Sequence, residues 1–213
     1  MKLADLTITD FVRELASVSP APGGGSVAAL CAGLSAALCS MVARLTRGKE
    51  KYRADWQAMD NLIHQADPLM ERFVELMDAD TSAYRLVVDA LRLPRETAEE
   101  QMVRKNAIES ASRKAAEVPM ETLKYTLRLA GFVKEAVAKG NVNCITDAGT
   151  AALLVRTAAY AAAYNVRINL SGITDTVFLE NCRSEVRRII FCIDDVIDAV
   201  EQHVDSLLKM AEG

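Results

Sequence analysis

Apolar residues recur at helical spacing along most of this chain. Between residues 50 and 90 they return every three or four positions, which is the period of one face of an α-helix. The recurring sites are Leu62, Leu69, Phe73, Leu76, Tyr84 and Val87. No stretch alternates apolar and polar residues over enough positions to form a half-buried strand. The pattern therefore predicts an all-α fold.

Helix-capping residues, glycines and prolines divide the pattern into helices. A short first helix is expected to end near Ser17, with Phe11, Val12 and Leu15 facing inward. The other expected helices span about 26–47, 50–90, 97–139, 146–170 and 174–210. The expected N-caps are Thr7 or Thr9, Ser26, Thr97, Thr146, and Thr174 or Asp175. Pro68, with Asp67 as a cap, is expected to kink its helix or start a new one, and Pro119 to interrupt or restart another. Gly48 and Gly140 are expected stops.

Long helices joined by short links fold back on one another, so the sequence predicts an antiparallel bundle. We expect a single domain over residues 1–213, with about six to eight helices. The hydrophobic content of 51% is enough for one such domain.

The chain is organised around the segment Pro20–Ser26, which reads Pro-Ala-Pro-Gly-Gly-Gly-Ser. Its prolines prevent one helix from running through it, and its glycines allow another surface to approach closely. The free amides of the helix that follows favour an anion or a carbonyl oxygen. The segment is thus either a tight turn between helices or a ligand-binding loop. It is not a P-loop, because no Gly-Lys-Ser/Thr follows.

The segment Ser26–Ala43 carries no charged residue, so a transmembrane helix has to be weighed against a buried one. Its small and weakly hydrophobic residues favour a helix buried inside a bundle, and no membrane is expected. Small residues also form a stripe that lets a second helix approach, in the same subunit or in a partner. They are Ala28, Ala32, Ser35, Ala36 and Cys39. We therefore expect a homo-oligomer, most simply a dimer.

Composition excludes some functions. The net charge of −4, with both signs interspersed, is unlike the concentrated basic patch of a nucleic-acid-binding protein. Five cysteines without CxxC spacing, and no signal peptide, indicate reduced thiols in a cytoplasm. Only His64 and His203 are present, both expected at the surface, so no metal site is predicted.

Two groups of polar residues stand out from this apolar background. Asn141, Asn143 and Asp147 surround a helix start, where Asp147 is either a capping residue or a functional carboxylate. Asn165 and Asn169 lie one turn apart on an Ala-rich helix, where they either join helices or bind a ligand. Asp147 and Asn165 share a helix face but are roughly 27 Å apart at 1.5 Å per residue. They therefore contact different ends of a ligand, or belong to different sites in an oligomer, or one is structural.

Other charged groups are interpreted more simply. Asp78, Asp80 and Tyr84 are expected on a solvated helix face. Arg44 and Lys49 belong to a basic cluster at a helix end, which is either solvated or able to bind a polyanion. No nucleophile–base pair can be assigned, since Ser26 has no evident partner.

An ordered set of motifs resembles the cyclodeaminase/cyclohydrolase family. The matching segments are Pro20–Leu30, Asp78-Ala-Asp80 with Tyr84, Leu91–Pro94, Gly140-Asn141 with Asp147-Ala148, and Ala162–Leu170. The resemblance implies an all-helical oligomer that hydrolyses 5,10-methenyltetrahydrofolate to 10-formyltetrahydrofolate. Alternatively, it implies a cyclodeaminase that closes 5-formiminotetrahydrofolate and releases ammonia, or a folate-binding oligomer without turnover.

The resemblance also implies a set of site residues, taken here as hypotheses. Asp147 would be the carboxylate that faces the pterin or methenyl group. The amides of Gly23, Gly24, Gly25 and Ser26 would bind a carboxylate or carbonyl, and Asn141, Asn143, Asn165 and Asn169 would bind other polar groups of the substrate. Arg44 and Lys49 would bind the glutamate tail. No cofactor is expected besides the folate substrate.

Overall fold

The computed structural model describes the backbone of residues 2–212 and the side chains of residues 2–210. Its α-helices are α1 (Ile8–Leu15), α2 (Gly24–Thr46), α3 (Trp56–Leu91), α4 (Ala98–Lys139), α5 (Ile145–Asn169) and α6 (Thr176–Glu212). Short 3-10 turns are η1 (Leu3–Asp5), η2 (Glu50–Asp55), η3 (Val142–Cys144) and η4 (Leu170–Gly172). No strand occurs in the described residues, and the predicted all-α class is confirmed.

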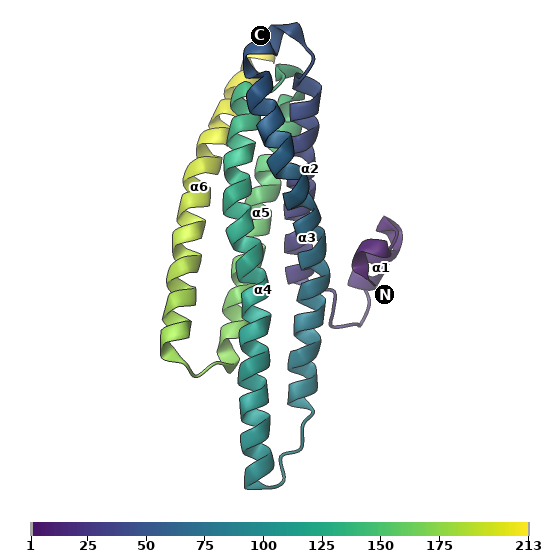
Figure 1. Cartoon of the computed structure of the whole chain (residues 1–213), viewed down its shortest axis with the longest axis vertical. Helices are drawn as coiled ribbons and strands as arrows, with labels where there is room; N and C mark the ends of the chain where they lie inside the picture. The colour runs from purple at the N-terminus through teal and green to yellow at the C-terminus, as the bar shows by residue number, and fades with distance from the viewer. Residues whose placement is uncertain (1, 213) are drawn as a thin grey trace.

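The long helices run alternately up and down the molecule (Figure 1). Helices α2 to α6 form one bundle, in which α3 and α4 extend below the ends of α5 and α6 as a pair (Figure 1). The short helix α1 stands to one side of this bundle (Figure 1). Phe11 of α1 is buried as expected, but Val12 is 56% exposed and Leu15 is 37% exposed. The prediction that these two residues face inward is wrong, because α1 lies outside the core.

Helix α2 is the core of the bundle and lies between α3 and α5. The small residues Ala28, Ala32, Ser35, Ala36 and Cys39 are fully buried. Ser35 donates a hydrogen bond of 2.8 Å to the backbone oxygen of Ala151 on α5, so the close neighbour of this stripe is in the same subunit. Burial raises the pKa of the Cys39 thiol to about 12, which keeps this cysteine protonated and unreactive.

Several predicted helix ends are confirmed, and each has a local cause. Thr7 caps α1, Thr97 and Glu100 form a capping box on α4, and α4 ends at Gly140. Asp175 accepts a 3.0 Å bond from the amide of Phe178 in the first turn of α6. The prediction for Thr146 is wrong, because α5 begins one residue earlier with Cys144 at the N-cap position and no side-chain cap.

Neither proline ends its helix, so the predictions that Pro68 starts a new helix and that Pro119 interrupts one are wrong. Helix α3 is continuous through Pro68, and α4 is continuous through Pro119. A proline inside a helix removes one backbone hydrogen bond, at a cost of about 3 kcal/mol or more. Helix α3 buries Leu62, Leu69 and Phe73 on both sides of Pro68, and this apolar burial offsets the loss. Asp67 is therefore not a cap, and it binds side chains of α2 instead.

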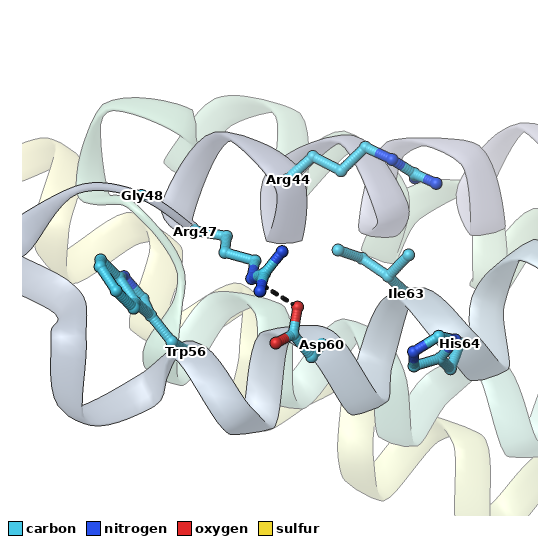
Figure 2. A pocket seen from close by; sticks show the side chains of 7 residues that line it. All are labelled: Arg44, Arg47, Gly48, Trp56, Asp60, Ile63 and His64. Atoms are coloured by element: carbon cyan, nitrogen blue, oxygen red, sulfur yellow. Dashed lines mark ion pairs between the residues drawn. The ribbon is translucent and has the colours of Figure 1, made fainter.

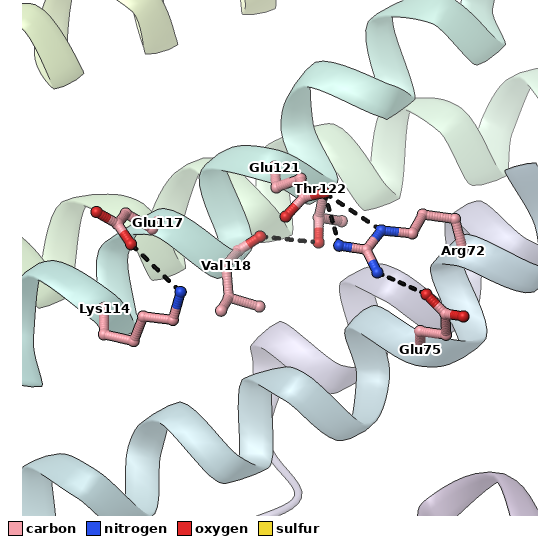
Figure 3. A network of polar contacts seen from close by, with 7 residues as sticks. All are labelled: Arg72, Glu75, Lys114, Glu117, Val118, Glu121 and Thr122. Carbon is pink, nitrogen blue, oxygen red and sulfur yellow. Dashed lines mark hydrogen bonds and ion pairs between the residues drawn. The ribbon is translucent and has the colours of Figure 1, made fainter.

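Polar contacts on the surface join α3 and α4. Arg72 of α3 donates hydrogen bonds of 2.8 and 3.2 Å to Glu121 of α4, and one of 2.5 Å to Glu75 (Figure 3). Lys114 pairs with Glu117 along α4 at 3.5 Å (Figure 3). These groups are exposed enough that each pair contributes only about 0–1 kcal/mol. The bundle therefore depends mainly on its apolar core.

Helix α2 is long and apolar enough to cross a membrane by length and composition alone. In the bundle, however, 61% of its apolar window is buried by other helices. It is the only helix in the described residues that meets this criterion. Its apolar character is explained by its central position, because a helix in contact with others on several sides needs an apolar surface nearly all round.

A candidate active site at the start of helix α2

The first turn of α2 contacts a carboxylate from α3. Gly23 is the N-cap residue and has no side chain to bond the free amides. The Ser26 hydroxyl donates a 2.9 Å hydrogen bond to Asp80 Oδ2 and lies 3.2 Å from the Thr81 hydroxyl. Ser26 is fully buried inside the helix, so the prediction that it is the N-cap is wrong. Asp80 takes over the usual role of a cap from a different helix.

Gly25 makes this contact possible. A Cβ atom at position 25 would lie 2.5 Å from the carboxyl carbon of Asp80 and 2.7 Å from its Oδ2 atom. Real Cβ atoms essentially never come so close to another atom, and the contact is made by a carboxylate that is itself held in place. The glycine is therefore needed to bring Asp80 against the helix start.

Burial changes the acid–base chemistry of Asp80. Loss of solvent raises the pKa of its carboxyl group, and this effect outweighs the hydrogen bonds from Ser26 that lower it. A carboxylate with a raised pKa is a stronger base than an ordinary aspartate. The prediction that Asp80 lies on a solvated face is wrong, since Asp80 is half-buried against the first turn of α2.

Asn165 of α5 lies on the other side of the same helix start. Its Nδ2 atom donates a 2.8 Å hydrogen bond to the backbone oxygen of Ala161. A Cβ atom at Gly24 would lie 3.1 Å from this Nδ2 atom. In the described residues, Asn165 Oδ1 has no hydrogen-bond donor, and Gly24 is exposed. The amide is therefore able to bind a polar ligand next to Asp80.

Asn169, one turn further along α5, has a structural contact. Its Nδ2 atom donates a 2.8 Å hydrogen bond to the backbone oxygen of Ala115 on α4. This contact agrees with the interhelical alternative for the pair of asparagines, although it leaves the amide oxygen free for another partner.

Asn141, Asn143 and Asp147 lie at the opposite end of α2. The backbone amide of Asn141 donates a 2.7 Å hydrogen bond to Thr46 Oγ1, which places the start of α5 beside the end of α2. Asn141 Oδ1 accepts a 3.2 Å bond from the amide of Asn143. Asn141 is buried, Asn143 is exposed and Asp147 is half-buried. Asp147 is thus roughly 27 Å from Asn165 along α5.

The basic residues at this end of α2 are already paired. Arg44 donates to Asp67 Oδ2 at 2.6 Å and also contacts Ser40. Hydrogen bonds from Arg44 and Ser40 hold the pKa of Asp67 below its usual value. Arg47 pairs with Asp60 at 2.7 Å across an open groove of about 620 Å³ between α2 and α3 (Figure 2). Lys49 is exposed beyond the end of the helix.

Apart from Asn169, which bonds to α4, the hypothetical site residues fall into two groups. The glycine cluster at the start of α2 contains Gly23, Gly24, Gly25, Ser26 and Asn165. The basic end contains Arg44, Lys49, Asn141, Asn143 and Asp147. Sequence reasoning did not include Asp80 among the site residues, although the motif Asp78-Ala-Asp80 was the signal for it.

Comparisons with known proteins agree with this architecture. The family model described as formiminotransferase-cyclodeaminase matches residues 7–188. A formimidoyltransferase-cyclodeaminase of Rattus norvegicus is 36% identical over 88% of this chain, which spans about a third (35%) of that protein. A methenyltetrahydrofolate cyclohydrolase of Methylorubrum extorquens is 33% identical over 86% of this chain and 88% of its own length.

A solved structure is also similar over nearly the whole chain. The crystal structure of a formiminotetrahydrofolate cyclodeaminase from Thermotoga maritima superposes with a TM-score of 0.88 at 25% identity, covering 97% of this chain and all of the other. The family match covers most of the chain, and the cyclohydrolase is similar over most of its own length. The chain therefore belongs to the formiminotransferase-cyclodeaminase family.

Proposed function

We propose that this protein is a methenyltetrahydrofolate cyclohydrolase, which hydrolyses 5,10-methenyltetrahydrofolate to 10-formyltetrahydrofolate. The observation that carries the proposal is the half-buried Asp80 carboxylate, 2.9 Å from the Ser26 hydroxyl at the glycine cluster. The similar length of the Methylorubrum extorquens cyclohydrolase also supports it. No metal or other cofactor takes part in the proposed reaction.

The reaction adds water to the carbon that joins N5 and N10. The water oxygen bonds to this carbon while a base takes a proton, and the product of this step is neutral and tetrahedral. The bond from carbon to N5 then breaks, N5 receives a proton while the hydroxyl group loses one, and the resulting formyl group stays on N10. The net change is addition of one water and release of one proton, which the cationic methenyl group requires.

Asp80 has the properties needed for the first proton transfer. Its raised pKa makes it a stronger base than an exposed aspartate, and its negative charge stabilises a cationic ring placed beside it. The Asn165 amide next to Gly24 is a candidate for the polar edge of the pterin. The Ser26 hydroxyl and backbone amide both bond to Asp80, so we assign Ser26 to holding this carboxylate rather than the substrate.

The formimino cyclodeaminase remains the alternative reaction. It is supported by the likeness to the Thermotoga maritima cyclodeaminase, which this chain matches from end to end. In that reaction N10 attacks the formimino carbon and ammonia leaves, so the same carbon passes through a tetrahedral state between N5 and N10. A site that stabilises this intermediate can serve either reaction.

Two assays separate these functions. Hydrolysis is measured as loss of methenyltetrahydrofolate absorbance, and cyclodeamination as release of ammonia from 5-formiminotetrahydrofolate. We expect the first activity. Ammonia release without hydrolysis would instead establish the cyclodeaminase. If neither substrate is turned over but folate still binds, the protein is a folate-binding oligomer and the proposed catalysis is wrong.

We further infer that the protein is a cytoplasmic homodimer that pairs through an uncharged face of α2 and α5. On α2 this face includes Leu34 and Leu45, each 48% exposed, and on α5 it includes Leu153, 58% exposed. Thr150 and Thr157 continue it along α5 without a charge. Contiguous apolar surface of this kind is typical of an interface.

Within one subunit, Val200 and Val204 are buried, which supports a single domain that continues beyond the family match.

Charge favours one arrangement of the two subunits. A two-fold axis along the helices would bring the basic ends, with Arg44 and Lys49, against their own copies, and like charges repel. A two-fold axis across the helices avoids this repulsion. It would place the glycine cluster of one subunit opposite the partner subunit's Asp147. In this arrangement both groups of predicted site residues would contribute to one folate site.

A further inference from the structure

A pocket of about 540 Å³ lies between the end of α5 and the start of α6. These two helix ends meet at the lower side of the bundle (Figure 1). Its lining residues are Arg167, Leu170, Ser171, Arg183, Val186 and Arg187. Arg183 and Arg187 are four residues apart on α6 and so share a face. Arg167 approaches from α5, and the pocket therefore contains three guanidinium groups from two helices.

These arginines are short of anionic partners. Arg187 donates a 3.0 Å bond to Glu180. Arg167 and Arg183 have no carboxylate within 4.0 Å and no side-chain hydrogen bond in the described part of the chain. Most other arginines of the protein are paired, including Arg44 with Asp67. The pocket therefore has an excess positive charge that a bound anion would neutralise.

The base of the pocket is apolar. Leu170 and Val186 are each only 6% exposed, so the guanidinium groups lie at the edge of a surface from which water is partly excluded. Charge-assisted hydrogen bonds are stronger in such a place than in open solvent. A guanidinium group presents two parallel donors to a carboxylate, so this pocket is suited to a ligand with more than one carboxylate.

The pocket is close to the proposed reaction site. Arg167 and Asn165 are two residues apart and point to opposite sides of α5, because successive residues are 100° apart in a helix. Between them, on the outer surface of the helix, are Tyr164 and Ile168, which are 61% and 68% exposed. A polar amide, an apolar surface and a cluster of guanidinium groups thus follow one another around a single turn of α5.

A folate has the same order of chemical groups: a polar pterin, an apolar aminobenzoyl ring and a glutamate with two carboxylates. We infer that Arg167, Arg183 and Arg187 bind the glutamate carboxylates of the substrate, while its aminobenzoyl ring lies over Tyr164 and Ile168. The inference rests on the proposed function, since it assigns the tail of the same substrate. It also replaces Arg44 in this role, because Arg44 is paired and lies at the other end of α2.

The test compares substrates with and without the tail. Arg167→Gln and Arg183→Gln are assayed with 5,10-methenyltetrahydrofolate and with the corresponding tetrahydropteroate, which lacks the glutamate. Each substitution should raise KM for the glutamate-bearing substrate about tenfold, by analogy with loss of one charge-assisted pair, and change kcat less than twofold. KM for the tail-free substrate should be unchanged. Arg188→Gln is the matched control, because Arg188 pairs with Glu185 and does not line the pocket.

Equal effects on both substrates, or no effect on either, would overturn the inference. A binding measurement keeps this result separate from failure of the proposed reaction. If the wild-type protein turns over neither folate substrate, calorimetry with 5-formyltetrahydrofolate and its pteroate analogue applies the same comparison to Kd. Loss of the difference between these two ligands in Arg183→Gln supports the tail site without any catalysis, and an unchanged difference contradicts it.

Discussion

The carboxyl carbon of Asp80 lies where a side chain at position 25 would have to go, only 2.5 Å from the site of a Cβ atom on Gly25. The position of the Asp80 carboxylate on α3 therefore requires a residue without a side chain at position 25 of α2. This relationship explains the glycine at position 25, in the first turn of α2, and it leads to predictions about stability and about catalysis.

Gly25→Ala should destabilise the fold by about 1–3 kcal/mol, the range for forcing extra volume into a packed site. The matched control is Gly131→Ala on α4, where a Cβ atom meets nothing within 4 Å. This control should stabilise the protein by about 0.5–1 kcal/mol, as alanine does when it replaces glycine inside a helix. Urea denaturation of both variants measures the difference, and equal midpoints would contradict the steric argument.

Asp80→Asn should lower kcat by about 10²–10⁴-fold, the usual contribution of a positioned acid or base. The amide fills the same space, so the variant should fold and bind folate. Asp78→Asn is the control, because Asp78 accepts a 2.6 Å bond from the amide of Leu3 and does not contact the glycine cluster. Loss of methenyl absorbance measures both. If Asp80→Asn retains activity within threefold of wild type, Asp80 is only a cap for α2.

The pH dependence follows from the raised pKa of Asp80. As a base it must be ionised, so kcat/KM should fall on the acid side at a pH above the ordinary aspartate pKa of 3.8. The folded state binds this proton more tightly than the unfolded chain does. The free energy of unfolding should therefore decrease as pH rises from 3.8 through the raised value. Asp80→Asn should lack this decrease, and the two unfolding curves against pH test it.

The proposed dimer predicts complementation between inactive variants. Asp80→Asn and Asp147→Asn are mixed, unfolded and refolded together. Half of the dimers are then mixed, and each mixed dimer has one intact site of two, so about a quarter of wild-type activity should return. Each variant refolded alone provides the control. No recovery, with dimers present by light scattering, would show that Asp80 and Asp147 do not act in one site across the interface.

Much of the fold could be predicted from the sequence because its signals are local. The N-cap at Thr97 and the stop at Gly140 each depend on a few neighbouring residues, and both are confirmed. The predicted helix breaks at Pro68 and Pro119 are wrong because the effect of a proline depends on packing against residues far away in the chain. Pro68 lies on the exposed side of α3 while the residues around it fill the core, and no local pattern reveals this balance.

The candidate site was harder to predict, because its contacts join residues far apart in the chain. Ser26 looked like a helix cap, but its hydroxyl bonds to Asp80, 54 positions away. Asp80 looked solvated, because nothing near it in sequence shows that α2 covers it. The separation of Asp147 from Asn165, in contrast, followed from helix geometry alone, and the continuous helix α5 contains both.

The lower part of α3 and α4 extends beyond the other helices as a pair (Figure 1). Its apolar residues have few neighbours, and Leu86, Leu91, Met102 and Val103 are 49–67% exposed. Two helices alone bury too little surface to be as stable as a whole bundle, so this hairpin should open on its own more often than the protein unfolds. Its amide hydrogens should therefore exchange with deuterium well before those of α2, which makes it the part of the molecule most open to proteases.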